Sequence, residues 1–230
     1  MKKIGIIQSS YIPWKGYFDI IHDVDTFVFL EDVQYTKQDW RNRNKVKVRE
    51  GTGWITVPVK DSKHHMRQKL CDVVIDSGRN WQRVHFDTFR MHYSQAKHYS
   101  RYAHLLDEFY LHRRWHHLSE MNIHFTTKIC EVLGIETELL SSVDHEFSGI
   151  GTDRLIEICQ YFQAGCFLTG PRAREYLDEE KTADAGIEVE YKDYSGYPEY
   201  PQLFPPFDHH VTVLDLIFNC GPDAPRHIWG

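Results

Sequence analysis

Several features that mark common protein classes are missing from this sequence. It has no run of about 18 apolar residues, so no segment is predicted to span a membrane. The apolar stretch after the first three residues is too short for a secretory signal and is interrupted at residues 8–10, which favours a cytoplasmic protein. Walker loops, dinucleotide-binding glycine loops and Gly-x-Ser-x-Gly elbows are also absent. P-loop kinases, classical dehydrogenases and serine hydrolases are therefore disfavoured.

Cysteine is too irregularly spaced for a disulfide framework. The chain has five cysteines, an odd number, and no Cys-x-x-Cys pair, which suits reduced thiols in a cytoplasmic core. Net charge is −6, so coating of extended nucleic acid is not expected. What the chain has in quantity is aromatic residues, with 13 Tyr, 13 Phe and 6 Trp, and these can supply stacking surfaces for a ligand.

The order of apolar segments predicts a doubly wound α/β fold. Apolar runs at residues 4–7 and 26–30 are predicted strands on either side of a short amphipathic helix. Residues 166–191 have the order strand, glycine, helix, glycine, strand, with the helix expected at 173–185; this is a parallel βαβ unit. Together these segments predict one α/β domain over residues 1–230 with a mainly parallel sheet.

The middle of the chain is predicted to be an insertion into this sheet. Period-two alternation at about 45–60 predicts a β-hairpin, and residues 71–75 are a further short strand candidate. From about 80 to 140 the period becomes helical, which indicates two to four helices. The last of them is expected to end at Gly134 with a glycine cap.

The first candidate site is the loop between the first strand and the first helix. Backbone N–H groups at such a helix start can bind an anion, and Ser10 and Lys15 add further donors. The spacing resembles that of adenylyl-transferring α/β enzymes, in which a His-x-Gly-His tetrad holds ATP phosphates. Here the tetrad reads Trp14-Lys15-Gly16-Tyr17, so both histidines are replaced. A purely structural interpretation, with Trp14 anchoring the helix and Lys15 solvated, stays open.

The second candidate site follows the second strand. Trp and Tyr placed among Arg, Asn and Gln can stack a planar ring while hydrogen-bonding phosphates or hydroxyls. The alternative is that the arginines lie on an exposed strand edge. The segment contains Asp32, Gln34, Tyr35, Lys37, Trp40, Arg41, Asn42 and Arg43.

The third candidate site is the turn at Gly170, where a predicted strand enters a predicted helix. Gly170 permits close backbone approach, and Arg172 and Arg174 lie near the positive helix end. Alternatively, Arg174 pairs with Glu175 or Asp178 on the surface. Because parallel strands end at the same edge of a sheet, we expect this turn and the first loop to form one cleft.

Histidine is abundant, but a metal site is not predicted. His112 and His116 have helical spacing that zinc sites use. Arg113 and Arg114 lie between them and would repel a dication. A solvated helix face is the simpler interpretation, and no structural metal is expected.

Six segments together resemble the WbqC-like protein family. The resemblance extends from residue 1 to about residue 221, and Ser9 stands where the family's usual opening, Gln-Pro-x-Tyr-Leu-Pro-Trp, has proline. It implies a setting in the synthesis of bacterial surface polysaccharides (O-antigen), beside enzymes that build amino sugars. The segments are residues 8–19, 32–35, 40–43, 54–59, 170–178 and 200–202.

These observations lead to an expected function. We expect transfer of a small acyl or aminoacyl group, such as glycine, to the amino group of a nucleotide-linked amino sugar. Activation by ATP with Mg²⁺ would follow the pantothenate-synthetase type, with Asp32 as the best available magnesium ligand. A pre-activated acyl donor and a non-catalytic nucleotide-sugar-binding or assembly protein are the alternatives. No feature predicts an oligomeric state.

The expected site residues fall into two groups. The catalytic candidates are Lys15, Asp32 and Gln34. The candidates for binding the substrate or nucleotide are Gln8, Ser10, Tyr11, Trp14, Tyr35, Lys37, Trp40, Arg41, Asn42, Arg43, Gly170, Arg172 and Arg174.

Overall fold

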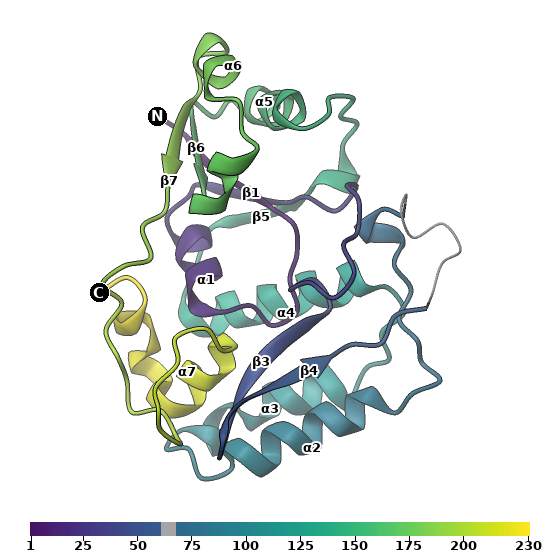
Figure 1. Cartoon of the computed structure of the whole chain (residues 1–230), viewed down its shortest axis with the longest axis vertical. Coiled ribbons are helices and arrows are strands. Elements are labelled where there is room, and N and C mark those ends of the chain that lie inside the picture. Colours follow the sequence, from purple (N-terminus) through teal and green to yellow (C-terminus); the bar gives the residue numbers. More distant parts are fainter. Residues whose placement is uncertain (61–67) are drawn as a thin grey trace.

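The computed structural model describes residues 1–60 and 68–230 and confirms the α/β fold (Figure 1). Within this part of the chain five strands form one all-parallel sheet in the order β5-β2-β1-β6-β7. The strands are β1 (Lys3–Ile7), β2 (Thr26–Phe29), β5 (Glu138–Ser141), β6 (Cys166–Thr169) and β7 (Glu188–Tyr191).

The strand order reverses direction at β1. From β1 the chain first moves outward through β2 to β5, and it later returns to β6 on the other side of β1. Crossovers between parallel strands are right-handed, so this reversal places the connecting helices on opposite faces of the sheet. Figure 1 shows α1 (Lys15–His22) on one face, and α5 (Thr152–Tyr161) with α6 (Glu179–Asp184) on the other. The crevice that ligands use in such folds therefore lies between β1 and β6.

Both faces of the sheet are buried. Phe27 and Phe29 of β2 pack into one hydrophobic cluster, together with α1 and the central helices. Ile4, Ile6 and Val28 face the opposite cluster, which includes residues of α5. Because neither face is left for solvent, the polar residues of this region gather at the strand ends.

The insertion packs on the α1 side of the sheet. The predicted hairpin is formed by β3 (Arg43–Val48) and β4 (Gly51–Thr56), which pair antiparallel as a separate two-stranded sheet. The helices of this side are α2 (Trp81–Tyr93), α3 (Tyr99–Tyr110), α4 (Leu118–Leu133) and α7 (Val213–Cys220). Gly134 ends α4 with a φ of 71°, as the glycine cap predicts. Among the described residues, no helix is both long and apolar enough to cross a bilayer.

Two local expectations differ from the structure, and one strand was not expected. Residues 71–75 form no strand of a sheet; Leu70–Asp72 is a 3₁₀ helix, and only isolated bridges follow it. Strand β5 was not predicted, because a four-residue strand with polar ends has no visible period. The helix expected at 173–185 is divided into a 3₁₀ helix, Pro171–Glu175, and α6. Asp178 causes the division, because its side chain accepts a hydrogen bond from the Lys181 N–H and so caps a new helix.

Candidate functional site

A cleft with two adjoining lobes lies at the carboxyl ends of β1 and β6. The first, which we call the sheet-edge lobe, has a volume of about 380 Å³. The second, the aromatic lobe, has a volume of about 570 Å³. We call the residues that line both lobes the junction: Trp14, Tyr17, Arg41, Gly170, Arg172 and Tyr194.

The junction joins segments that are distant in sequence. Trp14 and Tyr17 come from the start of α1, whereas Gly170 and Arg172 come from the turn after β6. Their meeting is the convergence that the parallel topology predicts, because β1 and β6 are neighbours and open at the same edge. The two loops therefore contribute to one site.

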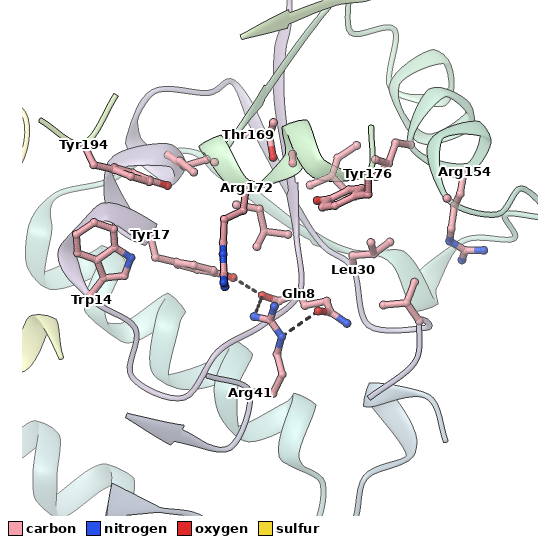
Figure 2. A pocket seen from close by; sticks show the side chains of 18 residues that line it. Gln8, Trp14, Tyr17, Leu30, Arg41, Arg154, Thr169, Arg172, Tyr176 and Tyr194 are labelled. Atoms are coloured by element: carbon pink, nitrogen blue, oxygen red, sulfur yellow. Dashed lines mark hydrogen bonds between the residues drawn. The ribbon is translucent and has the colours of Figure 1, made fainter. Parts of the chain in front are cut away.

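Arg41 is fixed in the junction by neutral acceptors alone. Its Nε donates to Gln8 Oε1 at 2.9 Å, and its Nη1 donates to Ser10 Oγ at 2.6 Å and to the Gln8 carbonyl at 3.4 Å. The Tyr17 hydroxyl donates to the same carbonyl at 3.1 Å (Figure 2). These contacts orient the guanidinium group without neutralising it.

Arg172 approaches from the opposite wall. Figure 2 shows its guanidinium group pointing toward Arg41 and Gln8. It has no hydrogen bond or ion pair in the described part of the chain, and no described carboxylate lines the sheet-edge lobe. Asp39 is the only carboxylate among the described residues that line the aromatic lobe. Two arginines without a carboxylate between them favour an anion, in a protein whose net charge is −6.

A buried glutamate supports this loop from behind. Glu31 is fully buried and accepts hydrogen bonds from the Ser9 N–H at 2.7 Å and from Ser9 Oγ at 2.9 Å. Burial raises the pKa of Glu31, while the hydrogen bonds from Ser119 and Ser9 oppose the rise. Asn122 of α4 donates to the Arg41 carbonyl at 2.8 Å. The loop that carries Gln8 and Ser10 is thus tied to the core on its far side.

Gly16 allows Trp14 to face the cleft. A Cβ atom on Gly16 would collide with the Trp14 indole, which folds back over the start of α1. The indole packs edge-on against Tyr194, with ring centroids 4.9 Å apart, and stacks on His210 at 5.4 Å and 24°. Gly16 therefore leaves space for the Trp14 indole, which forms one side of the cleft together with Tyr194 and His210.

Comparison with known proteins agrees with the resemblance seen in the sequence. Residues 8–227 match the WbqC-like protein family. The chain belongs to this family. It is also 43% identical over 228 residues to the uncharacterized protein Rv1507c of Mycobacterium tuberculosis (strain ATCC 25618 / H37Rv), covering 99% of this chain and 98% of that protein. No solved structure matches.

Ser9 marks a departure from the usual WbqC-like opening, which has proline there. Its N–H and its hydroxyl both donate to Glu31. Proline could provide neither donor. In this chain Ser9 therefore fastens the cleft loop to Glu31 in the core.

Lys15, expected to be catalytic, lies outside both lobes. Its ammonium donates to the carbonyls of His227 at 3.0 Å and Pro198 at 3.5 Å and lies 4.6 Å from the centre of the Tyr197 ring. Burial lowers the pKa of Lys15 to about 8. At the first position of α1, its side chain points toward the C-terminal segment whereas Trp14 and Tyr17 face the cleft.

Asp32 is also engaged elsewhere. One carboxylate oxygen forms an ion pair with Arg154, and the other accepts a hydrogen bond from Ser142 Oγ at 2.6 Å. Arg154 in turn donates to the carbonyls of Phe147 and Gly149. Asp32 therefore fastens the loop between β5 and α5, and both of its carboxylate oxygens already have protein partners. The geometry does not agree with its expected role as a magnesium ligand.

Three candidates point into the core. Tyr11 is fully buried, and its hydroxyl lies 2.7 Å from His85 Nδ1 and 2.6 Å from the Tyr110 hydroxyl. Asn42 is buried and donates to the Val57 carbonyl. Tyr35 is buried as well, and burial raises its pKa to about 12. None of the three lines either lobe, so they support the cleft wall from behind.

Four candidates lie outside both lobes, three of them exposed and one, Arg43, half-buried. The Arg43 guanidinium group lies 4.4 Å from the centre of the Trp54 ring, and that of Arg174 lies 3.7 Å from the centre of the Tyr191 ring. Gln34 and Lys37 are exposed, and Gln34 reaches the site only through its carbonyl, which accepts from Gln8 Nε2 at 3.2 Å. The structure thus gathers Gln8, Ser10, Trp14, Trp40, Arg41, Gly170 and Arg172 around the cleft.

Several cleft residues were not anticipated. Tyr17 stands inside the tetrad and could have been selected with Trp14. Tyr194 and His210 come from the long segment after β7, and no local pattern shows that this segment returns to the cleft. For His210 the sequence offered one signal, an aspartate two residues before it, Asp208. In the structure the Asp208 carboxylate lies 3.3 Å from His210 Nδ1.

Proposed function

We propose that this chain binds a nucleotide-linked amino sugar and transfers a small acyl or aminoacyl group to its amino group, as a step in the synthesis of a bacterial surface polysaccharide. The observation that carries this proposal is the convergence of Arg41 and Arg172 at the junction of two lobes. An anion there is held by side chains from two loops, with a further volume on either side of it. A nucleotide sugar has this layout, because its diphosphate lies between a base and a sugar.

The dimensions of the cleft support such a ligand. Each lobe falls within the range of about 300–1,000 Å³ that is typical of small-molecule sites. Charge-assisted hydrogen bonds from arginine are among the strongest available for phosphate. Arg41 is already oriented by Gln8 and Ser10, so little side-chain freedom is lost when the ligand binds.

Acyl transfer to an amine needs a proton acceptor, and we assign this role to His210. Its Nδ1 lies 3.3 Å from Asp208 Oδ1, which also accepts a hydrogen bond from the His210 N–H at 2.7 Å. Its ring stacks on Trp14, and Nε2 has no partner in the described part of the chain. As the amine nitrogen forms its bond to the acyl carbon, a histidine held in this way can take the proton that the amine loses. The bond from the acyl carbon to its carrier then breaks, and the histidine can pass this proton to the departing group, which is a thiolate when the donor is a thioester.

The source of the acyl group follows from what the cleft offers. The paired carboxylate of Asp32 does not suit the magnesium ion that accompanies ATP, and the two histidines of the adenylyl-transferring tetrad are replaced by Trp14 and Tyr17. Both points favour an acyl group that arrives already activated, as a thioester. ATP-dependent activation is the competing proposal.

Mass spectrometry of reaction mixtures tests the proposed function. Purified protein is incubated with UDP- and dTDP-linked amino sugars, with either acetyl-CoA or ATP, Mg²⁺ and glycine as the donor. We expect a product whose mass has increased by the acyl group, formed from the thioester without ATP. Replacement of His210 by Gln should lower turnover and leave nucleotide-sugar affinity unchanged. Tight binding without any product would favour a non-catalytic nucleotide-sugar-binding protein.

A further inference from the structure

The two lobes differ in their lining residues, and this difference determines which end of the ligand each lobe would bind. Resting on the proposed function, we infer that the amino sugar occupies the aromatic lobe, that the base occupies the sheet-edge lobe, and that Asp39 selects the amine over a hydroxyl group. Asp39 lies on the segment between Tyr35 and Arg41, and it lines the aromatic lobe together with Gly170.

The aromatic lobe has the walls of a sugar site. Trp14 and Trp40 line it, and although Trp40 packs against Trp54 with ring centroids 5.3 Å apart, it keeps 39% of its surface exposed. The C–H face of a pyranose packs on such rings, while its polar groups need acceptors and donors nearby. Asn44 also lines this lobe, but its amide already bonds to the Tyr11, Ile12 and Lys45 backbone. Arg172 and His210 also line this lobe, but Arg172 is a cation and His210 is the proposed proton acceptor, so Asp39, the only carboxylate among the described lining residues, is the group that can select an amine.

The sheet-edge lobe has a different character. Ile7, Leu30 and Leu155 give it apolar walls, and Tyr176 stands at its side with 66% of its surface exposed (Figure 2). The Thr169 hydroxyl has no partner in the described part of the chain and can reach the edge of a base. Arg154 also lines this lobe, but its guanidinium group is paired with Asp32. Apolar walls without a described carboxylate suit a neutral planar base and would be a poor site for an ammonium group.

Asp39 has one carboxylate oxygen available for a ligand. Oδ1 accepts a hydrogen bond from the Trp40 N–H at 2.7 Å, whereas Oδ2 has no partner among the described residues. Because the diphosphate of the ligand offsets Arg41 and Arg172 at the junction, an ammonium group in the aromatic lobe needs a carboxylate of its own to replace the water that it loses. Asp39 provides this carboxylate for the bound ammonium group, which has to release one proton before its nitrogen can attack the acyl carbon. A sugar with a hydroxyl group in the same place gains less from Asp39.

Calorimetric titrations of parent and Asp39→Asn protein test this assignment. The ligands are UDP, UDP-glucose and UDP-glucosamine, with the dTDP series run in parallel. In the parent we expect the amino sugar to bind about tenfold more tightly than its hydroxyl counterpart, as a hydrogen bond to a charged group implies. Asp39→Asn keeps the Oδ1 acceptor for Trp40 and should abolish this preference while leaving UDP affinity within twofold. Asp223→Asn, a change at an exposed aspartate far along the chain, is the matched control.

Two further measurements place the sugar in the aromatic lobe. Trp40→Ala should weaken both nucleotide sugars and leave UDP affinity unchanged. When the pH is raised above the pKa of the sugar amine, the ratio of the parent's affinities for UDP-glucosamine and UDP-glucose should decrease, because the ammonium charge is lost. A parent that binds UDP but shows no preference for the amine, or an Asp39→Asn variant that keeps the preference, would overturn the inference alone. No binding in either nucleotide series would overturn the proposed function together with it.

Discussion

Two polar regions of the molecule are built on opposite plans. The first region, which we call the C-terminal polar cluster, consists of buried residues of α1, α7 and the segments that pack on them. Its members are Lys15, Asp19, Lys47, Tyr200 and Asp215. Asp19 pairs with Lys192 at 2.8 Å and accepts from the Tyr197 hydroxyl at 2.6 Å. Asp215 Oδ2 accepts from the Tyr200 hydroxyl at 2.6 Å and from Gln202 at 2.8 Å. In this cluster both signs of charge lie together: Asp19 acts on Lys15 and Lys47 acts on Asp215, although Asp215 Oδ1 has no hydrogen-bond partner among the described residues.

The cleft junction has the reverse arrangement. Arg41 bonds only to neutral acceptors, and Arg172 has no partner in the described part of the chain. Buried charges that are compensated contribute to folding, whereas cations left uncompensated at a cleft attract a ligand. The comparison suggests a criterion: charged residues that lie beside the opposite charge stabilise the fold, whereas cations of the cleft that have no carboxylate partner bind the ligand. Mutations in the two regions should therefore change different measured quantities.

The largest effect is expected from Asp215→Ala. The change leaves the buried Lys47 without its nearby negative charge and leaves Tyr200 without an acceptor. Breaking such a buried arrangement costs about 3–5 kcal/mol of unfolding free energy. Urea denaturation measures the loss, and nucleotide affinity of the folded fraction should not change. A loss below about 1 kcal/mol would show that the cluster does not stabilise the fold.

The same carboxyl predicts a pH dependence of stability. Burial raises the pKa of Asp215 from 3.8 to about 6, so between these pH values the folded state binds more protons than the unfolded state. The unfolding free energy should therefore fall as pH rises from 4 to 6, by at most about 3 kcal/mol. Asp215→Asn should have a flatter profile in this window. Identical slopes for the two proteins would contradict the raised pKa.

In the junction, Arg41→Ala should act mainly on binding. Loss of a charge-assisted hydrogen bond to phosphate is worth about 1.5–3 kcal/mol, which corresponds to a weakening of about ten- to hundredfold in nucleotide affinity. Stability should also fall by about 1 kcal/mol, because Gln8 and Ser10 lose a donor. Arg43→Ala is the matched control, since Arg43 lies over Trp54 outside the cleft. An equal loss of nucleotide affinity in Arg41→Ala and Arg43→Ala would contradict the assignment of Arg41, but not Arg43, to the binding site.

The smallest effect on binding is expected from Lys15→Met. The parent's lowered pKa of about 8 means that the folded state loses the Lys15 proton before the unfolded state does. The unfolding free energy of the parent should consequently rise with pH between about 8 and 10.5, and that of the variant should rise less. Nucleotide affinity at neutral pH should stay within twofold. A large loss of nucleotide affinity in this variant would show that Lys15 contributes to the binding site.

The sequence predicts the fold better than it predicts side-chain directions. Apolar runs and strand ends locate β1, β2, β6 and β7, and the doubly wound topology then places Gln8 and Gly170 at one edge. A strand as short as β5 has no period to detect, and the cap at Asp178 divides a helix that apolar spacing alone would continue.

Within the predicted site segments, neighbouring residues turn in opposite directions. Trp14 faces the cleft while Lys15 faces the C-terminal segment, and Arg41 faces the cleft while Asn42 faces the core. Composition cannot distinguish such neighbours, because the backbone conformation of an irregular loop decides their directions. His210 depends in addition on the path of a long segment that shows no periodic pattern.

The central claim is that the junction binds the phosphates of a nucleotide through an uncompensated arginine. Its most direct test is the calorimetric titration of UDP and dTDP into the parent, Arg172→Ala and Arg174→Ala. The two arginines lie on the same 3₁₀ helix, but Arg174 lies over Tyr191 outside the cleft. We expect Arg172→Ala to weaken the better ligand about tenfold or more and Arg174→Ala to leave its affinity within twofold. Equal affinities in all three proteins, or no binding in the parent, would contradict the account.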